Sequence, residues 1–67
     1  MKNFLKVARA KQNMTQGTLA EKVKVSRQTI NAIELGKFVP STLLALKLAK
    51  MLHTTVEELF TLEAPDA

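Results

Sequence analysis

The residues whose chemistry stands out first are three long polar side chains close together in the chain, Arg27, Gln28 and Asn31. Arginine offers a planar fork of N–H donors, whereas glutamine and asparagine each carry a carbonyl acceptor beside an NH₂ donor. In the major groove, an arginine fork matches guanine O6 and N7, and a glutamine or asparagine fork matches adenine N6 and N7. Ala32, which follows Asn31, is small enough to leave such an approach open and can touch a thymine methyl. The four residues are therefore candidates for contact with base pairs.

The element that must hold these side chains is a helix over Arg27–Leu35. Ser26 before it is a favourable N-cap, and Gly36 after it is a favourable C′ residue. At about 100° per residue, Ile30 and Ile33 fall on one side of this helix and the candidate residues fall on the other. A polar helix face is most often simply solvated, so this pattern alone leaves base recognition and plain solvent exposure both open.

The 3.6-residue period of apolar side chains extends through the rest of the chain and predicts an all-α fold. Thr15 is the N-cap of the second helix, and Thr55 with Glu58 forms a capping box for the last one. Lys24, in the short turn between the second and third helices, is expected at positive φ, which costs a non-glycine residue on the order of 1 kcal/mol. The expected helices run from about Asn3 to Gln12, over Gln16–Val23, over Arg27–Leu35, over Thr42–His53, and from Thr55 to about Phe60.

Length and charge limit the possible partners. The 67 residues allow one domain over 1–67, in which 61–67 form a short tail. The net charge is +4 and is unevenly distributed. Residues 1–37 hold eight lysines and arginines against two glutamates, a net of +6, whereas residues 38–67 hold two lysines against four acidic residues, a net of −2. The amino-terminal half therefore suits an anion, which could be nucleic acid, an acidic protein or an anionic membrane surface.

Several classes of function lack the residues they need. His53 is the only histidine and there is no cysteine, so we expect no metal site and assign His53 to the end of a helix. Glu57 and Glu58 are adjacent and point in different directions, so they do not form a catalytic carboxylate pair. Because no set of nucleophile, base and orienting residue can be assembled either, we expect no catalytic residues, no enzyme and no cofactor. The longest apolar run, Leu43–Leu46, is far too short for a membrane span, and there is no signal-peptide pattern. A cytoplasmic protein is therefore expected.

A helix, a short turn and a second helix opened by Ser26 resemble the helix-turn-helix of the phage-repressor family of transcription regulators (XRE, Cro/repressor-like). The resemblance covers nearly the whole chain and implies a compact five-helix domain that uses helices two and three against DNA. It also implies a homodimer on a two-fold-related, palindromic operator. The residues that carry it are Arg9, Met14-Thr15-Gln16, Leu19-Ala20, Val25-Ser26-Arg27-Gln28-Thr29-Ile30, Ile33-Glu34, Gly36-Lys37, Pro40-Ser41 and Glu58-Leu59-Phe60.

Three residues depart from the pattern of that family. Lys24 stands where glycine is usual, Gly17 where a helix former is usual, and Val39 where a polar residue is common. None of them belongs to the expected reading surface, so we expect an effect on stability rather than on recognition.

Phosphate contacts would position the protein on DNA rather than specify a sequence. The first backbone N–H groups of the helix that begins at Gln16 form a potential anion site. Thr15 and Ser26 can add hydroxyls beside it. Lys37 and the backbone around Phe38 follow the third helix and could hold the other side of the groove. These five residues are the predicted phosphate contacts.

Arg9 has two possible roles. It could bind phosphate, but it lies beside the core face of the first helix, and Glu34 likewise borders the apolar face of the third. The resemblance also implies an ion pair between these two helices. We therefore favour an internal pair of Arg9 with Glu34 over a phosphate contact.

A homodimer needs a surface that the core does not use. Leu43 and Leu46 fall outside the core side of the fourth helix, although scattered exposed leucines are ordinary. Some very short members of the resembled family pair terminal strands into a small sheet in the dimer, and Lys2–Phe4 with Thr61–Leu62 could do so here. The predicted interface is an isologous contact that comprises Leu43, Leu46, Phe60 and Leu62, extended by the Met1–Asn3 segment.

The sequence thus predicts a sequence-specific binder of double-stranded DNA that regulates transcription, most simply as a repressor. One alternative is a protein-interaction module, or an antitoxin-like protein with a partner protein, on the same fold. Another is a basic amphipathic protein on a membrane surface, but one shared core explains the apolar helix stripes better than a membrane does.

Overall fold

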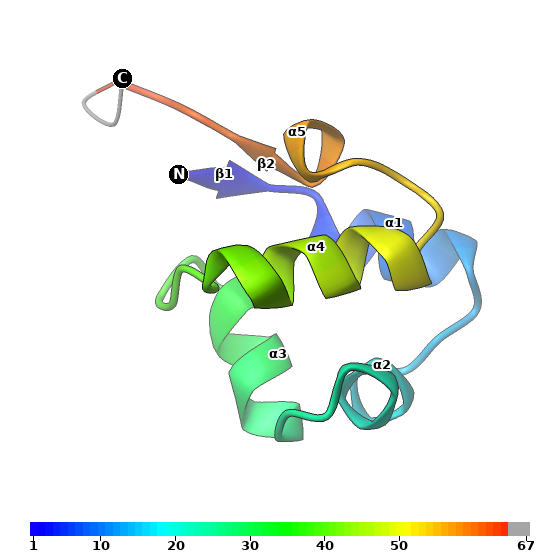
Figure 1. Ribbon diagram of the computed structural model, residues 1–67. Helices are drawn as coiled ribbons and strands as arrows, with labels where there is room; N and C mark the ends of the chain where they lie inside the picture. Colours follow the sequence, from blue (N-terminus) through cyan, green and yellow to red (C-terminus); the bar gives the residue numbers. More distant parts are fainter. Residues whose placement is uncertain (65–67) are drawn as a thin grey trace.

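The computed structural model describes residues 1–64 and arranges them as five helices and two short strands (Figure 1). This confirms the predicted all-α, five-helix fold with a terminal strand pair. No helix within the described residues is long and apolar enough to cross a membrane. Residues 65–67 of the predicted tail lie outside the described residues. The helices are α1 (Leu5–Lys11), α2 (Gln16–Val23), α3 (Arg27–Glu34), α4 (Thr42–Met51) and α5 (Val56–Leu59), and the strands are β1 (Lys2–Asn3) and β2 (Phe60–Thr61).

One shared core lies where the helices meet. Its largest fully buried side chains come from all five helices: Leu5, Leu19, Ile30, Ile33, Leu48 and Leu59. Each such side chain stabilises the fold by about 1.5–3 kcal/mol through removal of apolar surface from water. In Figure 1, α2 and α3 extend to one side of α4, whereas α5 and the strands lie on the other. The outer faces of α2 and α3 are therefore left uncovered by the rest of the chain.

Four of the helices begin at a serine or threonine whose side chain caps the first turn. Thr15, Ser26, Ser41 and Thr55 each accept the backbone N–H of the residue three positions later, at 3.0–3.2 Å. Such a cap is typically worth about 1 kcal/mol. The capping box predicted for the last helix is only half formed, because the Glu58 carboxylate accepts the hydroxyl of the preceding threonine, Thr54, at 3.1 Å.

Four helices also end in the same backbone turn, with one residue in the left-handed region. These residues are Asn13, Lys24, Gly36 and His53, at φ of 54°, 60°, 76° and 55°. After each of them, the next N–H returns to the carbonyl five residues earlier, which satisfies a terminal carbonyl of the helix. The positive φ expected at Lys24 is confirmed. At His53 the turn ends α4 at Met51, two residues before the predicted end, and α3 and α5 each end one residue earlier than predicted.

The two terminal strands pair with each other within one chain. Lys2 lies opposite Thr61 and Asn3 opposite Phe60, in antiparallel register. The ladder continues through the backbone N–H of Phe4, which donates to the Leu59 carbonyl at 2.8 Å. Asn3 also anchors β1, because its Nδ2 donates to the Ile33 carbonyl at 2.9 Å and its Oδ1 accepts the N–H of Leu5. The first helix consequently begins at Leu5 rather than near Asn3.

Candidate nucleic-acid interface

The candidate base-contacting residues share the outer face of α3. Arg27, Gln28 and Asn31 are exposed, and Ala32 is half-buried beside them. Because Ile30 and Ile33 on the opposite face are buried in the core, the rotation of α3 about its axis is set. The three polar side chains line a hollow of about 380 Å³ together with Gln16 of α2. The structure therefore gathers these hydrogen-bonding groups into one accessible, concave surface.

The start of α2 supplies groups for an anion. A hollow of about 510 Å³ beside it is lined by Arg9, Thr15, Gln16, Gly17 and Arg27. The N–H groups of Gln16 and Gly17 lie in the first helical turn, where no intrahelical acceptor is available. The helix dipole adds partial positive charge there, and the Arg27 guanidinium adds a full one. This combination can hold a phosphate group.

Gly17 lines this hollow, a role that the sequence did not predict. The sequence indicated only that a glycine stands where a helix former is usual. In the structure, a Cβ at this position would meet only Thr15 Oγ1, at 3.9 Å. The backbone at the start of α2 is therefore open to close approach by a ligand.

The two capping hydroxyls are less available than the sequence suggested. Thr15 Oγ1 accepts the N–H of Thr18 and donates its own proton to Thr18 Oγ1, at 3.0 Å for each contact. Ser26 Oγ lies 2.9 Å from Thr29 Oγ1 and also accepts the Thr29 N–H. The Thr18 hydroxyl proton stays available for an anion in place of that of Thr15. Sequence reasoning missed Thr18 and Thr29, although the threonine three residues after each cap was a detectable pattern.

Lys37 and Phe38 follow α3, on the loop before α4. The backbone N–H of Lys37 is occupied by the Ala32 carbonyl at 2.9 Å, so only its ammonium group can serve an anion. Both side chains are exposed. Lys37 therefore offers a point charge at the carboxyl end of α3, opposite the end that carries Arg27.

Arg9 and Glu34 form the ion pair between α1 and α3. Arg9 Nε lies 2.8 Å from Glu34 Oε2, and Nη2 donates to Oε1 at 3.2 Å. The two side chains are only 15% and 7% exposed, and Arg9 Nη1 also donates to the Met14 carbonyl at 2.9 Å. Burial alone would raise the pKa of Glu34, but hydrogen bonds from Arg9 and Gln16 and the charges of Arg9 and Lys6 hold that pKa below its ordinary value of 4.5. This contact keeps Arg9 turned toward Glu34 and Met14.

The Gln16 side chain turns toward α3 rather than outward. Its Nε2 donates both to Glu34 Oε1 at 3.0 Å and to Asn31 Oδ1 at 3.1 Å. The Gln16 side-chain donors are thereby used inside the protein, so this residue can serve a phosphate only through its backbone N–H. The contact joins the Arg9–Glu34 pair to a residue of the exposed α3 face, a connection that was not predicted.

A separate apolar surface lies over α4 and the strands. Leu43, Leu46 and Leu62 are exposed by 64%, 56% and 64%. Phe60, in β2, is half-buried and packs against the core, so only part of this residue is exposed on this surface. An apolar hollow of about 320 Å³ beside Leu46 and Phe60 also includes Met1 and Val39. Exposed apolar area of this kind is typical of protein contacts.

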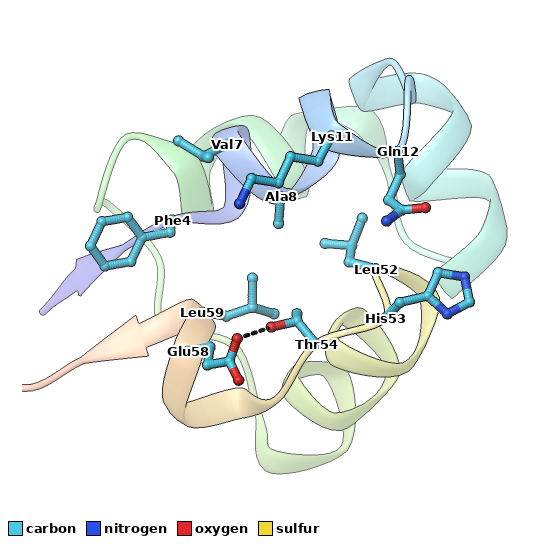
Figure 2. A pocket seen from close by; sticks show the side chains of 10 residues that line it. All are labelled: Phe4, Val7, Ala8, Lys11, Gln12, Leu52, His53, Thr54, Glu58 and Leu59. Carbon is cyan, nitrogen blue, oxygen red and sulfur yellow. Dashed lines mark hydrogen bonds between the residues drawn. The ribbon is translucent and has the colours of Figure 1, made fainter.

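One more cleft, of about 310 Å³, lies between α1 and the connection from α4 to α5 (Figure 2). Lys11 extends along it, and the Glu58 carboxylate bonded to Thr54 lies on the other side. None of the candidate DNA-contacting residues lines this cleft. Among residues 1–64, no three histidine, aspartate or glutamate side chains gather closely enough to hold a metal ion.

Comparison with known proteins agrees with this architecture. The family model described as helix-turn-helix matches residues 5–59. An uncharacterized HTH-type transcriptional regulator of Methanocaldococcus jannaschii is 54% identical over 63 residues, which cover 94% of this chain and 96% of the relative. The uncharacterized HTH-type transcriptional regulator YgzD of Bacillus subtilis is 49% identical over the same shares of both chains. A further HTH-type regulator, of Methanothermobacter thermautotrophicus, is 38% identical over 100% of this chain and 99% of its own length.

The matched segment begins at the first residue of α1 and ends at the last residue of α5, so it contains the core, both helices of the candidate interface and the Arg9–Glu34 pair. From these findings, the chain belongs to the helix-turn-helix family of phage-repressor (XRE) type, as a DNA-binding regulator of transcription and not an enzyme.

Proposed function

We propose that the protein represses transcription by binding a palindromic operator as a homodimer, with α3 of each protomer in the major groove. The observation that carries this proposal is the exposed face of α3, on which Arg27, Gln28 and Asn31 are held outward by the buried isoleucines behind them. A major groove admits one helix, and residues near the start of a recognition helix reach the bases.

The side chains have separable roles in this proposal. Arg27 and Gln28, in the first turn of α3, take base edges as hydrogen-bonded forks, while Ala32 lies against a thymine methyl. The phosphates on one side are held at the start of α2, by the N–H groups of Gln16 and Gly17. Those on the other side are held by Lys37. Because these contacts replace counterions on the DNA, affinity is expected to fall steeply as salt concentration rises.

The dimer is proposed to form through the apolar surface over α4 and the strands. Leu43, Leu46 and Leu62 are each more than half exposed in the single chain, and an isologous contact would cover all three on both protomers at once. Such a dimer would present two α3 helices to successive major grooves, roughly 34 Å apart. Occupation of a promoter by the dimer would exclude the polymerase, which is the simplest route to repression. A regulator of this kind acts where the DNA lies, in the cytoplasm.

A second candidate function uses the same apolar surface differently. If Leu43 and Leu46 face another protein, the chain would act as an antitoxin-like or adaptor protein whose partner occupies the dimer surface. The exposed leucines fit both a homodimer and a complex with another protein, and the oligomeric state of the free protein distinguishes the two.

Selection of bound sequences from a random duplex library tests the proposal. We expect an enriched site with two-fold symmetry and half-sites about one helical turn apart. Sedimentation of the free protein should give a dimer that Leu43→Lys together with Leu46→Lys converts to a monomer. A library that yields no enriched sequence would refute sequence-specific binding, and an enriched site without symmetry, bound by a monomer, would refute the dimer and favour the partner-protein version.

A further inference from the structure

We propose that Gln16 is a positioning residue that fixes which end of the Asn31 side-chain amide faces DNA, and that it thereby sets the base preference at the pair Asn31 contacts. This inference rests on the proposed function, since it requires α3 in the major groove. It goes beyond that function because it assigns a role in specificity to a side chain on α2 that need not touch a base.

The Glu34 carboxylate determines which group donates and which accepts in the hydrogen bonds that link it to Gln16 and Asn31. Its Oε2 accepts Arg9 Nε at 2.8 Å and its Oε1 accepts Arg9 Nη2 at 3.2 Å. A carboxylate bound in this way has no proton to donate. Any third group against Oε1 must therefore be a donor, and the Gln16 side chain lies there at 3.0 Å. The amide of Gln16 must consequently present its NH₂ group to Glu34, whichever way the two amide ends could otherwise be placed.

The same NH₂ group then decides the orientation of Asn31. Gln16 Nε2 lies 3.1 Å from the Asn31 amide as well as 3.0 Å from Glu34. An NH₂ group has two protons and no acceptor capacity, so each proton serves one of these neighbours. The end of Asn31 that faces Gln16 must be the carbonyl Oδ1. The other end, the Nδ2 amino group, is left on the exposed face of α3, where Asn31 lines the hollow shared with Arg27 and Gln28.

An outward donor has a definite consequence for recognition. In the major groove, guanine offers two acceptors, adenine offers N7 and thymine offers O4, whereas cytosine offers only its N4 amino donor. A side chain that presents N–H donors can therefore hydrogen-bond to the first three bases but not to cytosine. Replacement of one such hydrogen bond by a donor facing a donor is expected to lower affinity by roughly three- to tenfold, from the usual net worth of a hydrogen bond.

The first arm of the test needs no DNA. In the nuclear magnetic resonance spectrum of the free protein, the Gln16 side-chain NH₂ protons should exchange with water more slowly than those of Gln28. Gln28 is an exposed glutamine whose side chain forms no hydrogen bond with any of residues 1–64, so it serves as the matched control. Gln16→Met, which keeps the length of the side chain but removes its amide, should shift the Asn31 side-chain resonances. Gln16 protons that exchange as fast as those of Gln28 would overturn the proposal.

The second arm measures base preference, after Asn31→Ala has identified the base pair that Asn31 contacts. At that pair the parent should bind the site with cytosine three- to tenfold more weakly than the sites with the other bases. Gln16→Met should bind all four sites with nearly equal affinity, while preferences at other pairs stay unchanged. Asn31→Asp keeps an acceptor toward Gln16 but turns an acceptor outward, so its preference should reverse toward cytosine. Thermal unfolding of each variant, measured in parallel, establishes that it is folded.

The outcomes separate the two proposals. If the parent binds no duplex DNA, the proposed function fails, and the exchange rates of the first arm alone decide whether Gln16 holds Asn31. If DNA is bound but Gln16→Met keeps the cytosine penalty of the parent, or Asn31→Asp shows no reversal, the positioning role of Gln16 is refuted while DNA binding stands.

Discussion

The Arg9–Glu34 ion pair gives the sharpest prediction about stability. Removal of one partner of a buried pair typically costs 3–5 kcal/mol, because the other charge is left without compensation. Glu34 is 7% exposed and Arg9 is 15% exposed, so a little solvent reaches the pair and the lower end of that range applies. We expect Arg9→Met and Glu34→Gln each to lower the free energy of unfolding by about 3 kcal/mol. At about 0.05–0.15 kcal/mol per residue, a chain of this length holds only about 3–10 kcal/mol in total.

The assay is urea denaturation at pH 7, followed by far-ultraviolet circular dichroism, for the parent, both single variants and the double variant. Because the double variant leaves no unpaired charge, it should lose less than the sum of the single losses, with a coupling of about 0.5–3 kcal/mol. Lys22→Met is a suitable control, since this exposed lysine forms no ion pair with another described residue and its replacement should change stability by less than about 0.5 kcal/mol. Single losses as small as that of the control, or strictly additive losses, would refute the reasoning.

Four further predictions concern acid stability, two backbone positions and DNA binding. Since the pKa of Glu34 is lowered in the folded state, its contribution to stability is present above its ordinary pKa of 4.5 and should be lost as the pH falls below that value. When the free energy of unfolding is measured at decreasing pH, it should therefore decline less steeply for Glu34→Gln than for the parent. Gly17→Ala should raise the unfolding free energy by up to about 1 kcal/mol, because the added methyl group meets only Thr15 Oγ1 at 3.9 Å; a loss in denaturant melts would show that this glycine is required for folding. His53→Gly should add about 0.5–1 kcal/mol by relieving the φ of 55°, and no increase in melting temperature would mean that the left-handed turn is not strained. In fluorescence anisotropy, Arg27→Ala should cost about 1–3 kcal/mol on the selected site with relaxed base preference, whereas Lys37→Ala should weaken all duplexes alike; equal effects of the two variants would contradict their assigned roles.

The helices and their ends were largely accessible from the sequence. Hydroxyl caps at Thr15 and Ser26 act within three residues of the chain, so their effect is visible in the sequence itself. Lys24 at positive φ was also predictable, because tight turns between helices often need one residue in that conformation. Asn13 and His53 adopt the same conformation without a glycine to mark it, and the end of α4 was placed two residues too late as a result.

The side-chain contacts between helices were much harder to predict from the sequence. The Arg9–Glu34 contact was favoured from position on two core faces together with the family resemblance. The side chain of Gln16 gave no such signal, since a glutamine at the start of a helix faces solvent in most settings. Its contacts to Asn31 and Glu34 span 15 and 18 residues and depend on how closely α2 and α3 approach.

The sequence by itself determined the number of helices, the composition of the core and which face of α3 is polar, because caps and a 3.6-residue period operate over a few neighbouring residues. Only the tertiary structure decided that the terminal strands pair within one chain. It also decided that the hydroxyls of Thr15 and Ser26 are hydrogen-bonded to those of neighbouring threonines, and that the Asn31 carbonyl accepts a hydrogen bond from Gln16. Hydrogen bonds of this second kind join atoms whose separation depends on the crossing of helices and on single rotamers. Local sequence does not encode those distances, which arise when the shared core closes.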